Sequence, residues 1–458
     1  MKFMARKGRR TVVSLGASVV LVTLAVGSES IASGAIAGAA PAGKFAGQTL
    51  TVLIPAPTTN VAAVNEFNST VMALFQKQTG ASLQYQTYTS ASDELTSIET
   101  SAVSHSGPDV MNLGTTLVPT AYATHDFATL NASDWAQMGG QKAFFAQQLK
   151  MGGPNANSYI GVPIDSVPFA MAYNTALFHK AGITHAPTTW SQYVADAEKI
   201  NDPKKGIYGT GFDPADSYDP WKDYWTFALQ QGGDFVSPNN KKSTLASPAV
   251  VNSVQFWFDW YTKFHIVNPQ SLTWKGSDLV DAFAAGKVGE IPIQTINSVP
   301  TYLSGAIGHN FAFAPPPSVP YGMKAMPKGG QPASTIVSGQ DDVVAKYANK
   351  ALAVQYLKLA TSPYVQRLQW EQLNELPVIT SAAQSAVKSD PKLVGPFVTS
   401  LENADPTAFI GAWGPIESAL AGATEEFATK VESSHQLPVS YIQSVLKSVD
   451  SQIQPQLS

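Results

Sequence analysis

Apolar and polar positions follow two different periods along the first part of the chain. The pattern of residues 49–56 (TLTVLIPA) predicts a buried strand that ends at Pro55, and 83–88 and 109–114 are two further short strand-like runs. Between them, 61–79 and 91–104 carry apolar residues at helical spacing. This order of strand, helix, strand, helix and strand predicts a parallel sheet with right-handed crossovers.

The same patterns continue through the rest of the chain. Residues 159–174 form two extended segments split at Asp165, which is expected to be a crossover between domains. The proline-rich stretch 315–332 is the most linker-like segment. In the helix 91–104, the acidic residues expected on the exposed face are Asp93, Glu94 and Glu99. Further helices are expected over 190–200, 221–231, 249–264, 277–285, 342–360, 363–373 and most of 410–457, and strands over 206–212 and 290–296.

Composition excludes several classes of protein. The 458 residues carry a formal net charge of −4, so the chain lacks the basic surface that nucleic-acid phosphates require. It contains no Cys, which excludes a disulfide scaffold, a thiolate metal site and a lipidated N-terminal Cys. The length suggests two large domains.

The first forty residues have the pattern of a secretory signal. A basic cluster at the N-terminus precedes an apolar run from Val12 to about Val26, and small residues follow as far as Ala40. We expect residues 1–39 to be a signal peptide, although an uncleaved anchor helix is the alternative. Its removal takes away five basic residues and one acidic residue, which lowers the formal net charge from −4 to −8.

Five sequence blocks then occur in a recognisable order. They are GPDVMNLG to HDFATLN (107–131), YIGVPIDSVPFAMAYN to VADAEKI (159–200), DAFAAGKVGEIPI (281–293), GGQPASTIV to LATSP (329–363) and LNELPVITSAA (373–383). In this order and spacing, the chain resembles the extracellular solute-binding proteins of bacterial ABC importers, family 1, which include maltose- and oligosaccharide-binding proteins.

The resemblance implies an α/β protein with the two-lobed, type II periplasmic-binding-protein-like fold. Each lobe would be a mostly parallel sheet flanked by helices, with hinge strands near 165 and 331. Lobe one would comprise 45–164 and 332–374, and lobe two 166–330 and 375–458. The implied function is capture of a sugar or oligosaccharide in the interlobe cleft and delivery to a membrane permease, by an exported monomer without a cofactor.

Ligands of open α/β sheets bind at the carboxyl ends of strands, which directs attention to loops. Thr59 and Asn60 follow the first strand, and Gly114 and Thr115 follow the third. Their hydroxyl, amide and backbone groups could bind a polyol, although helix capping is the alternative role for Thr and Asn.

Aromatic rings that stack on sugars are the second expected feature. Trp221 and Trp225 follow a polar loop that contains Asp216, and they are candidates for a stacking platform. Trp413 lies in a late segment similar to the one in which maltose-binding relatives carry a stacking Trp, and Trp370 is a further candidate. The remaining predicted ligand contacts are Asp165, Asp216, Gln294, Asn297 and Gln331.

One position departs from the family pattern. Where relatives often place a stacking Trp after the strand 290–296, this chain has Asn297, Ser298 and Val299, so maltose-type specificity does not carry over directly. The spacing of Asp213, Asp216 and Asp219 does not fit an EF-hand calcium loop, and no metal is expected.

No enzyme motif of the common nucleophile, phosphate-binding or zinc-protease types occurs in the sequence. Two alternatives to a sugar-binding protein remain open. One is a binding protein for a non-sugar solute such as a polyamine, phosphonate or peptide-like molecule, which a cleft dominated by charged residues rather than by Trp would favour. The other is a secreted glycoside hydrolase, which needs two facing carboxylates.

Overall fold

The computed structural model describes residues 43–58, 60–333, 335–402 and 404–457. The predicted signal peptide, 1–39, lies outside these residues, as does Thr59. Within the described ranges, no helix combines the length and the apolar character that crossing a membrane requires.

The first sheet has five strands in the order β2-β1-β3-β10-β4. β1 runs parallel to both β2 and β3, as the sequence predicts, whereas β10 runs antiparallel to β3 and β4. The strands are β1 (Thr49–Pro55), β2 (Ser82–Tyr88), β3 (Val110–Gly114), β4 (Gly161–Ser166) and β10 (Gly339–Val344). We call this sheet and its helices the first lobe.

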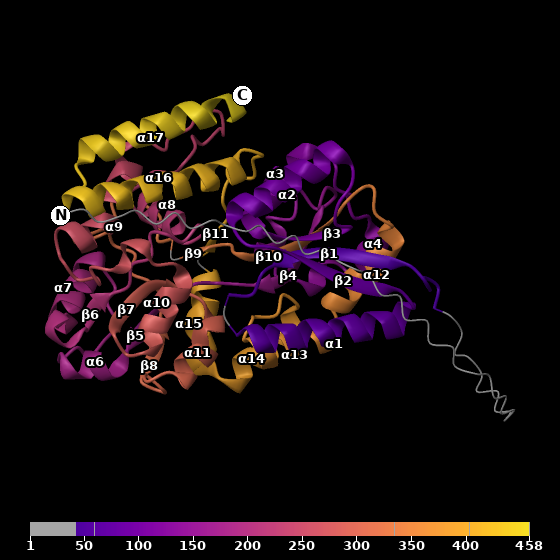
Figure 1. Cartoon of the computed structure of the whole chain (residues 1–458), viewed down its shortest axis with the longest axis horizontal. Helices are drawn as coiled ribbons and strands as arrows, with labels where there is room; N and C mark the ends of the chain where they lie inside the picture. Colours follow the sequence, from indigo (N-terminus) through magenta and orange to yellow (C-terminus); the bar gives the residue numbers. More distant parts are fainter. Residues whose placement is uncertain (1–42, 59, 334, 403, 458) are drawn as a thin grey trace, which may run out of the picture. The chain divides into compact units, whose positions relative to one another are not determined.

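Helices cover both faces of the first sheet (Figure 1). One face packs on α1 (Val61–Thr79), α12 (Lys350–Ala360) and α13 (Pro363–Leu373), in a core that includes Val71 and Phe75. The opposite face packs on α2 (Ala91–Ser104) and α3 (Val118–Thr124). Because α1 follows β1 and α2 follows β2, the loops after the strands lie together at one edge of the sheet.

The second sheet has four strands in the order β6-β7-β5-β8. β6 and β7 are parallel, and β5 is antiparallel to β7 and β8, so both sheets are mixed. The strands are β5 (Ala170–Asn174), β6 (Tyr208–Thr210), β7 (Val288–Gln294) and β8 (Phe311–Ala314). We call this sheet and its helices the second lobe.

The second sheet is also covered on both faces. One face packs on α10 (Gly276–Ala284), α11 (Val299–Ser304) and α15 (Pro391–Glu402). The other face packs on a thick aromatic layer, to which α7 (Trp190–Ile200), α8 (Pro220–Gln230), α9 (Pro248–Thr262), α16 (Trp413–Ser434) and α17 (Val439–Ile453) contribute. This layer buries six Trp side chains almost completely.

The remaining elements are short. They are α4 (Ala132–Gln137), α5 (Ala146–Leu149), α6 (Thr175–Lys180), α14 (Thr380–Ser389), the pair β9 (Thr335–Ile336) and β11 (Ala404–Asp405), and several 3₁₀ turns that include η1 (Thr115–Leu117) and η5 (Ile296–Ser298).

The chain passes between the two sheets repeatedly. It leaves the first sheet after β4, returns from β8 to β10, and leaves again between α13 and α14. The helix expected over 342–360 was wrong at its start, because residues 342–344 belong to β10. Helix α12 begins at Lys350, after Asn349, whose side chain accepts a hydrogen bond from the Leu352 amide. β8, α14 and α15 were not predicted.

Candidate functional site

A cavity of about 380 Å³ lies where the two lobes meet. Pro55, Thr58 and Tyr88 line it from the first lobe, at the ends of β1 and β2. Asp165 and Gln340 line it at the ends of β4 and β10, Glu375 lines it from a segment where the chain passes between the sheets, and most of the remaining wall belongs to the second lobe. We call it the cleft cavity.

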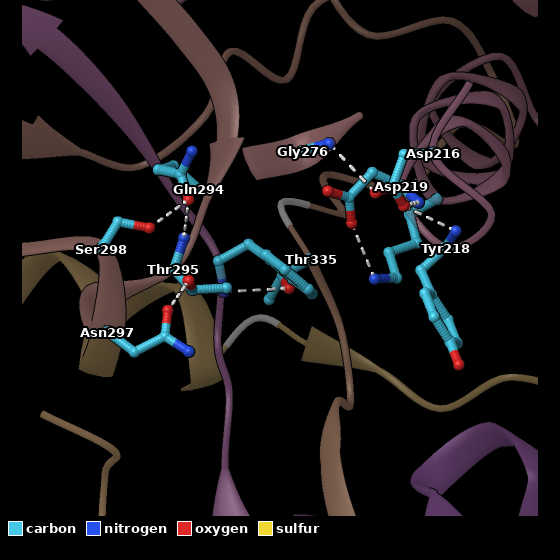
Figure 2. A network of polar contacts seen from close by, with 11 residues as sticks. Asp216, Tyr218, Asp219, Gly276, Gln294, Thr295, Asn297, Ser298 and Thr335 are labelled. Carbon is cyan, nitrogen blue, oxygen red and sulfur yellow. Dashed lines mark hydrogen bonds and ion pairs between the residues drawn. The ribbon is translucent and has the colours of Figure 1, made fainter. Parts of the chain in front are cut away.

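The loop between β6 and α8 forms the acidic part of the cavity wall. Asp216 organises this loop, because its Oδ1 accepts hydrogen bonds from the backbone amides of Tyr218 and Asp219 at 2.8 and 3.1 Å. Its Oδ2 accepts one from the amide of Gly276 at 3.0 Å, at the start of α10 (Figure 2). Asp216 therefore holds the loop and α10 together at the cavity wall.

Three carboxylates converge beside Gly276. A Cβ atom at this glycine would lie 3.2 Å from Asp216 Oδ2, 3.3 Å from Asp219 Oδ2 and 3.8 Å from Asp213 Oδ2. Lys222 Nζ donates a hydrogen bond to Asp219 Oδ1 at 3.0 Å and lies over the ring of Phe169. The absence of a side chain at position 276 leaves room for this convergence.

Burial and mutual repulsion shift the protonation of this cluster. Burial raises the pKa of Asp213 well above its usual range, and the charges of Asp219, Asp216 and Asp223 add to the effect. Burial also raises the pKa of Asp223 well above its usual range. Burial alone would lower the pKa of Lys222, but the charge and hydrogen bond of Asp219, together with the charges of Asp216 and Glu417, outweigh burial and raise that pKa. The loop thus holds more acid than its single lysine can neutralise.

Amide and hydroxyl groups form a second part of the wall, at the end of β7. Gln294 Oε1 accepts hydrogen bonds from Ser298 Oγ and from the Thr295 amide, each at 2.9 Å, and Thr295 Oγ1 donates to Asn297 (Figure 2). Asn60 of the first lobe donates from Nδ2 to the carbonyl of Asn297 at 3.2 Å. Gln294 and Asn297 line the cavity, whereas Asn60 does not line it and is joined to it only through this bond to Asn297.

The first lobe contributes a glutamate that sequence reasoning placed wrongly. Glu94 was expected to be exposed, but it is only 1% exposed because α2 turns it under the end of β3. Its Oε1 accepts a hydrogen bond from the Gly114 amide at 2.6 Å, and its Oε2 accepts one from Tyr218 of the second lobe at 3.2 Å. Burial raises the pKa of Glu94 to about 7.

The helical spacing of residues 91–104 could have predicted that Glu94 is buried. Glu94, Ile98 and Ser101 lie at helical spacing and are all buried, so Glu94 shares the inner face with an isoleucine. Gly114 and Thr115 are part of the same region but do not line the cavity. Thr115 Oγ1 instead donates to the carbonyl of Gly339 at 2.6 Å, which joins η1 to β10.

Asp165 lies at the end of β4 and lines the cavity. The Gln340 amide donates to its Oδ1 at 2.7 Å, which fixes it against β10. Burial, followed by the charge of Glu375, raises the pKa of Asp165 well above its usual range. Asp165 and Glu375 thus add two further carboxylates to the cavity wall.

The predicted stacking tryptophans lie elsewhere. Trp221, Trp225 and Trp413 are at most 2% exposed and belong to the aromatic core behind the cavity. Trp413 packs edge-on against Trp221 and stacks on Phe235, so its ring faces are covered by protein. They are buried because α8 and α16 pack against each other and turn these rings inward, which corrects their expected role as a sugar platform.

Two other predicted contacts also lie away from the cavity. Trp370 is half-buried against the core formed by α10, α11 and α15. Gln331 is exposed, and its backbone amide donates to the Leu229 carbonyl at 3.0 Å. Both were inferred from position in the chain, which does not specify the direction of a side chain.

Comparison with known proteins gives relatives of one kind. A binding protein of Brucella abortus (strain 2308) is 26% identical over 184 residues, which are 40% of this chain and 41% of that protein, so the match spans about two fifths of the relative's length. Among solved structures, an ABC transporter solute-binding protein from Thermotoga lettingae TMO bound with α-D-tagatose has a TM-score of 0.74 at 19% identity, covering 90% of this chain and all of that one.

Maltose-bound MalE3 of T. maritima is similar to the same degree, with a TM-score of 0.74 at 16% identity over 89% of this chain and 99% of that one. These likenesses show the two-lobed fold. The model of the bacterial extracellular solute-binding protein family matches residues 70–395, which is well over half of the chain. The chain therefore belongs to the bacterial extracellular solute-binding protein family.

Proposed function

We propose that this protein is the substrate-binding component of an ABC import system, which captures a sugar-like solute in the cleft cavity and delivers it to a membrane permease. The observation that carries the proposal is the cavity itself, whose wall is built by both lobes from carboxylate, amide and hydroxyl groups. Such groups form the hydrogen bonds that a polyhydroxylated solute needs. The sugars named for the similar structures support the same class of solute.

Closure of the lobes would couple binding to delivery. Bonds such as Tyr218 to Glu94 and Asn60 to Asn297 join the two sides next to the cavity. A solute that contacts both walls stabilises the closed state, which shifts the population toward it. We further propose that residues near 165 and 331 act as hinges, that the lobes divide as 45–164 with 332–374 and 166–330 with 375–458, and that the closed form docks on the permease.

The same proposal places the protein outside the cytoplasm, in a periplasm or at the outer face of the membrane, as a monomer without a lipidated Cys. It has no catalytic activity of its own. Incubation with oligosaccharides, followed by chromatography for products, tests this last point, and turnover of any of them would contradict it.

A thermal-shift screen of the purified protein against sugars, polyols and peptides tests the binding function. Ligand binding raises stability by RT ln(1 + [L]/Kd), so a solute present at about 100 times its Kd adds about 2.7 kcal/mol. We expect a rise in Tm with at least one polyhydroxylated solute. A screen in which no such solute raises the Tm would count against the proposal.

A further inference from the structure

We propose that the solute of the cleft cavity carries an ammonium group, and that this group binds between Asp213, Asp216 and Asp219 beside Gly276. The inference rests on the proposed solute-binding function and names the chemical class of the solute: an amine-bearing sugar or polyol, or a polyamine.

The first argument is the charge of the cavity wall. Among the described residues that line it, the ionisable side chains that bear positive charge are limited to Lys222. The carboxylates that line it are Asp165, Asp213, Asp216, Asp219, Asp223 and Glu375. Burial of carboxylates without counter-charges is costly, and a cation from outside the protein would offset that cost.

The second argument is that acceptors in the wall lack donors. Asp223 is 6% exposed and lines the cavity, and its Oδ1 has no hydrogen-bond partner, while its Oδ2 accepts a bond from Trp257 Nε1 at 2.9 Å. Asp213 is also 6% exposed, and its charged neighbours are three carboxylates and Lys222. Lys222 already bonds to Asp219, so it does not supply the donors that these groups need.

The third argument is geometric. Three carboxylate oxygens, one each from Asp213, Asp216 and Asp219, gather on one side of Gly276, since each lies within 3.2 to 3.8 Å of the position that a Cβ atom on this residue would take. An ammonium group has three donors and binds best where several acceptors converge. No group of His, Asp or Glu side chains in the described part of the chain is placed to hold a metal ion, so the geometry points to an organic cation.

The neighbouring wall accounts for the rest of such a solute. Gln294, Asn297 and Ser298 offer amide and hydroxyl groups on the same cavity, at the end of β7 (Figure 2). A molecule with an amine at one end and hydroxyls at the other would satisfy both parts of the wall. A neutral sugar would satisfy the amides but would leave the carboxylate cluster with Lys222 as its counter-charge.

Isothermal titration calorimetry on the purified full chain with matched solutes tests the inference. The first pair is chitobiose in its free-amine form, which carries two amines, and cellobiose, which carries hydroxyls in their place. Glucosamine and glucose form a second pair, and spermidine represents amines without a sugar ring. At about pH 6 these amines are protonated. We expect the amine-bearing member of at least one pair, or spermidine, to bind at least ten times more tightly than the neutral sugars.

Two variants locate the amine. Asp213→Asn removes a charge at constant size and should weaken binding of the amine by about tenfold or more, as expected when a close charge pair is lost. Gly276→Ala adds a methyl group against the three carboxylates, so it should crowd the proposed site and also weaken binding. The control Asp281→Asn removes an exposed carboxylate on the same helix as Gly276 and should leave the affinity unchanged. Circular dichroism establishes that the variants are folded.

The outcomes separate this inference from the proposed function. Neutral sugars that bind as tightly as their amine partners, or amine binding that survives both cavity variants, would overturn the inference and leave the solute-binding function standing. Failure of every sugar, polyol and amine to bind would overturn both.

Discussion

The acidic loop that ends at Asp219 and the tryptophans of the helix α8 that follows it are close in sequence but face different environments. The loop lines the cleft cavity with carboxylates, and Asp213 and Asp219 contribute to its wall. In α8, Trp221 and Trp225 are buried in the aromatic core, where they contact the layers formed by α9 and α16. The sequence predicted the two tryptophans as the platform for binding, yet the carboxylates of the acidic loop border the cavity and these tryptophans do not.

The difference follows from what each residue type gains from burial. A Trp side chain buries up to about 250 Å² of mostly apolar surface, so a thick helical layer stabilises itself by collecting such rings. A carboxylate loses hydration in the same place and gains little in return. Buried carboxylates at a cavity wall therefore carry more information about binding than buried aromatic residues do.

The largest effect is expected on the aromatic side. Trp413→Ala removes a fully buried ring that packs against Trp221 and Phe235, and it should lower the free energy of unfolding by about 3–5 kcal/mol. Urea unfolding followed by fluorescence measures this loss. The matched change Tyr321→Ala, at a side chain that is 41% exposed, should cost far less.

Solute affinity of the folded Trp413→Ala protein sharpens the contrast. If Trp413 is a core residue, the fraction that remains folded should bind solute with nearly unchanged affinity. A variant that kept its stability but lost binding would restore Trp413 to the role predicted from the sequence.

These residues also mark what the sequence could predict. Helical spacing and strand order predicted most elements, and the order of the five blocks predicted the two-lobed fold, because both depend on local pattern. Asp165, Asp216, Gln294 and Asn297 line the cavity, because each lies at or after a strand end, and their contact with a ligand stays a prediction. Trp413 and Glu94 were misplaced because their direction depends on which helices pack together, which involves residues far apart in the chain.

The next effect concerns Glu94, whose raised pKa should make stability fall as pH rises. A carboxyl with a folded pKa of about 7, above its unfolded value near 4.3, contributes stability that is present below the unfolded pKa and is lost as pH rises through about 7. The free energy of unfolding of Glu94→Gln, measured relative to that of wild type, should therefore rise by on the order of 2–3 kcal/mol between about pH 5 and pH 8. Urea unfolding at the two pH values measures the gain.

Glu99→Gln is the matched control for this prediction, because Glu99 lies on the same helix and is exposed. It should show no comparable gain. Equal behaviour of the two variants would mean that the burial of Glu94 does not control the pH dependence.

A smaller effect is expected at Tyr218, through which the acidic loop reaches the first lobe. Tyr218→Phe removes the hydroxyl that donates to Glu94 Oε2, and it should cost about 1–1.5 kcal/mol of unfolding free energy. The cost should be larger at about pH 8 than at pH 5, since hydrogen bonds to an ionised carboxylate are stronger. Tyr364→Phe, at a side chain that is 50% exposed, provides the control, and an equal cost in both variants would contradict the prediction.

The smallest effect is expected at Asn60, which bonds to the second lobe through uncharged groups. Asn60 has φ 50°, in the left-handed region, and its side chain donates to the Asn297 carbonyl at 3.2 Å. Asn60→Gly removes the bond but keeps the backbone free, and Asn60→Ala removes the bond and adds strain. The lost hydrogen bond and the added backbone strain should each cost about 0.5–1 kcal/mol of unfolding free energy, so the alanine variant should be the less stable of the two in urea unfolding.

The glycine variant isolates the contact between the lobes. Its solute affinity should fall by less than about fivefold, because a single neutral hydrogen bond has a net value of about 1 kcal/mol. Asp213→Asn is expected to lower the affinity for an amine by more than this fivefold limit. If Asn60→Gly weakened binding as much as Asp213→Asn does, the amide wall rather than the acidic loop would be the principal binding surface, and the contrast between charged and neutral parts of the cavity would fail.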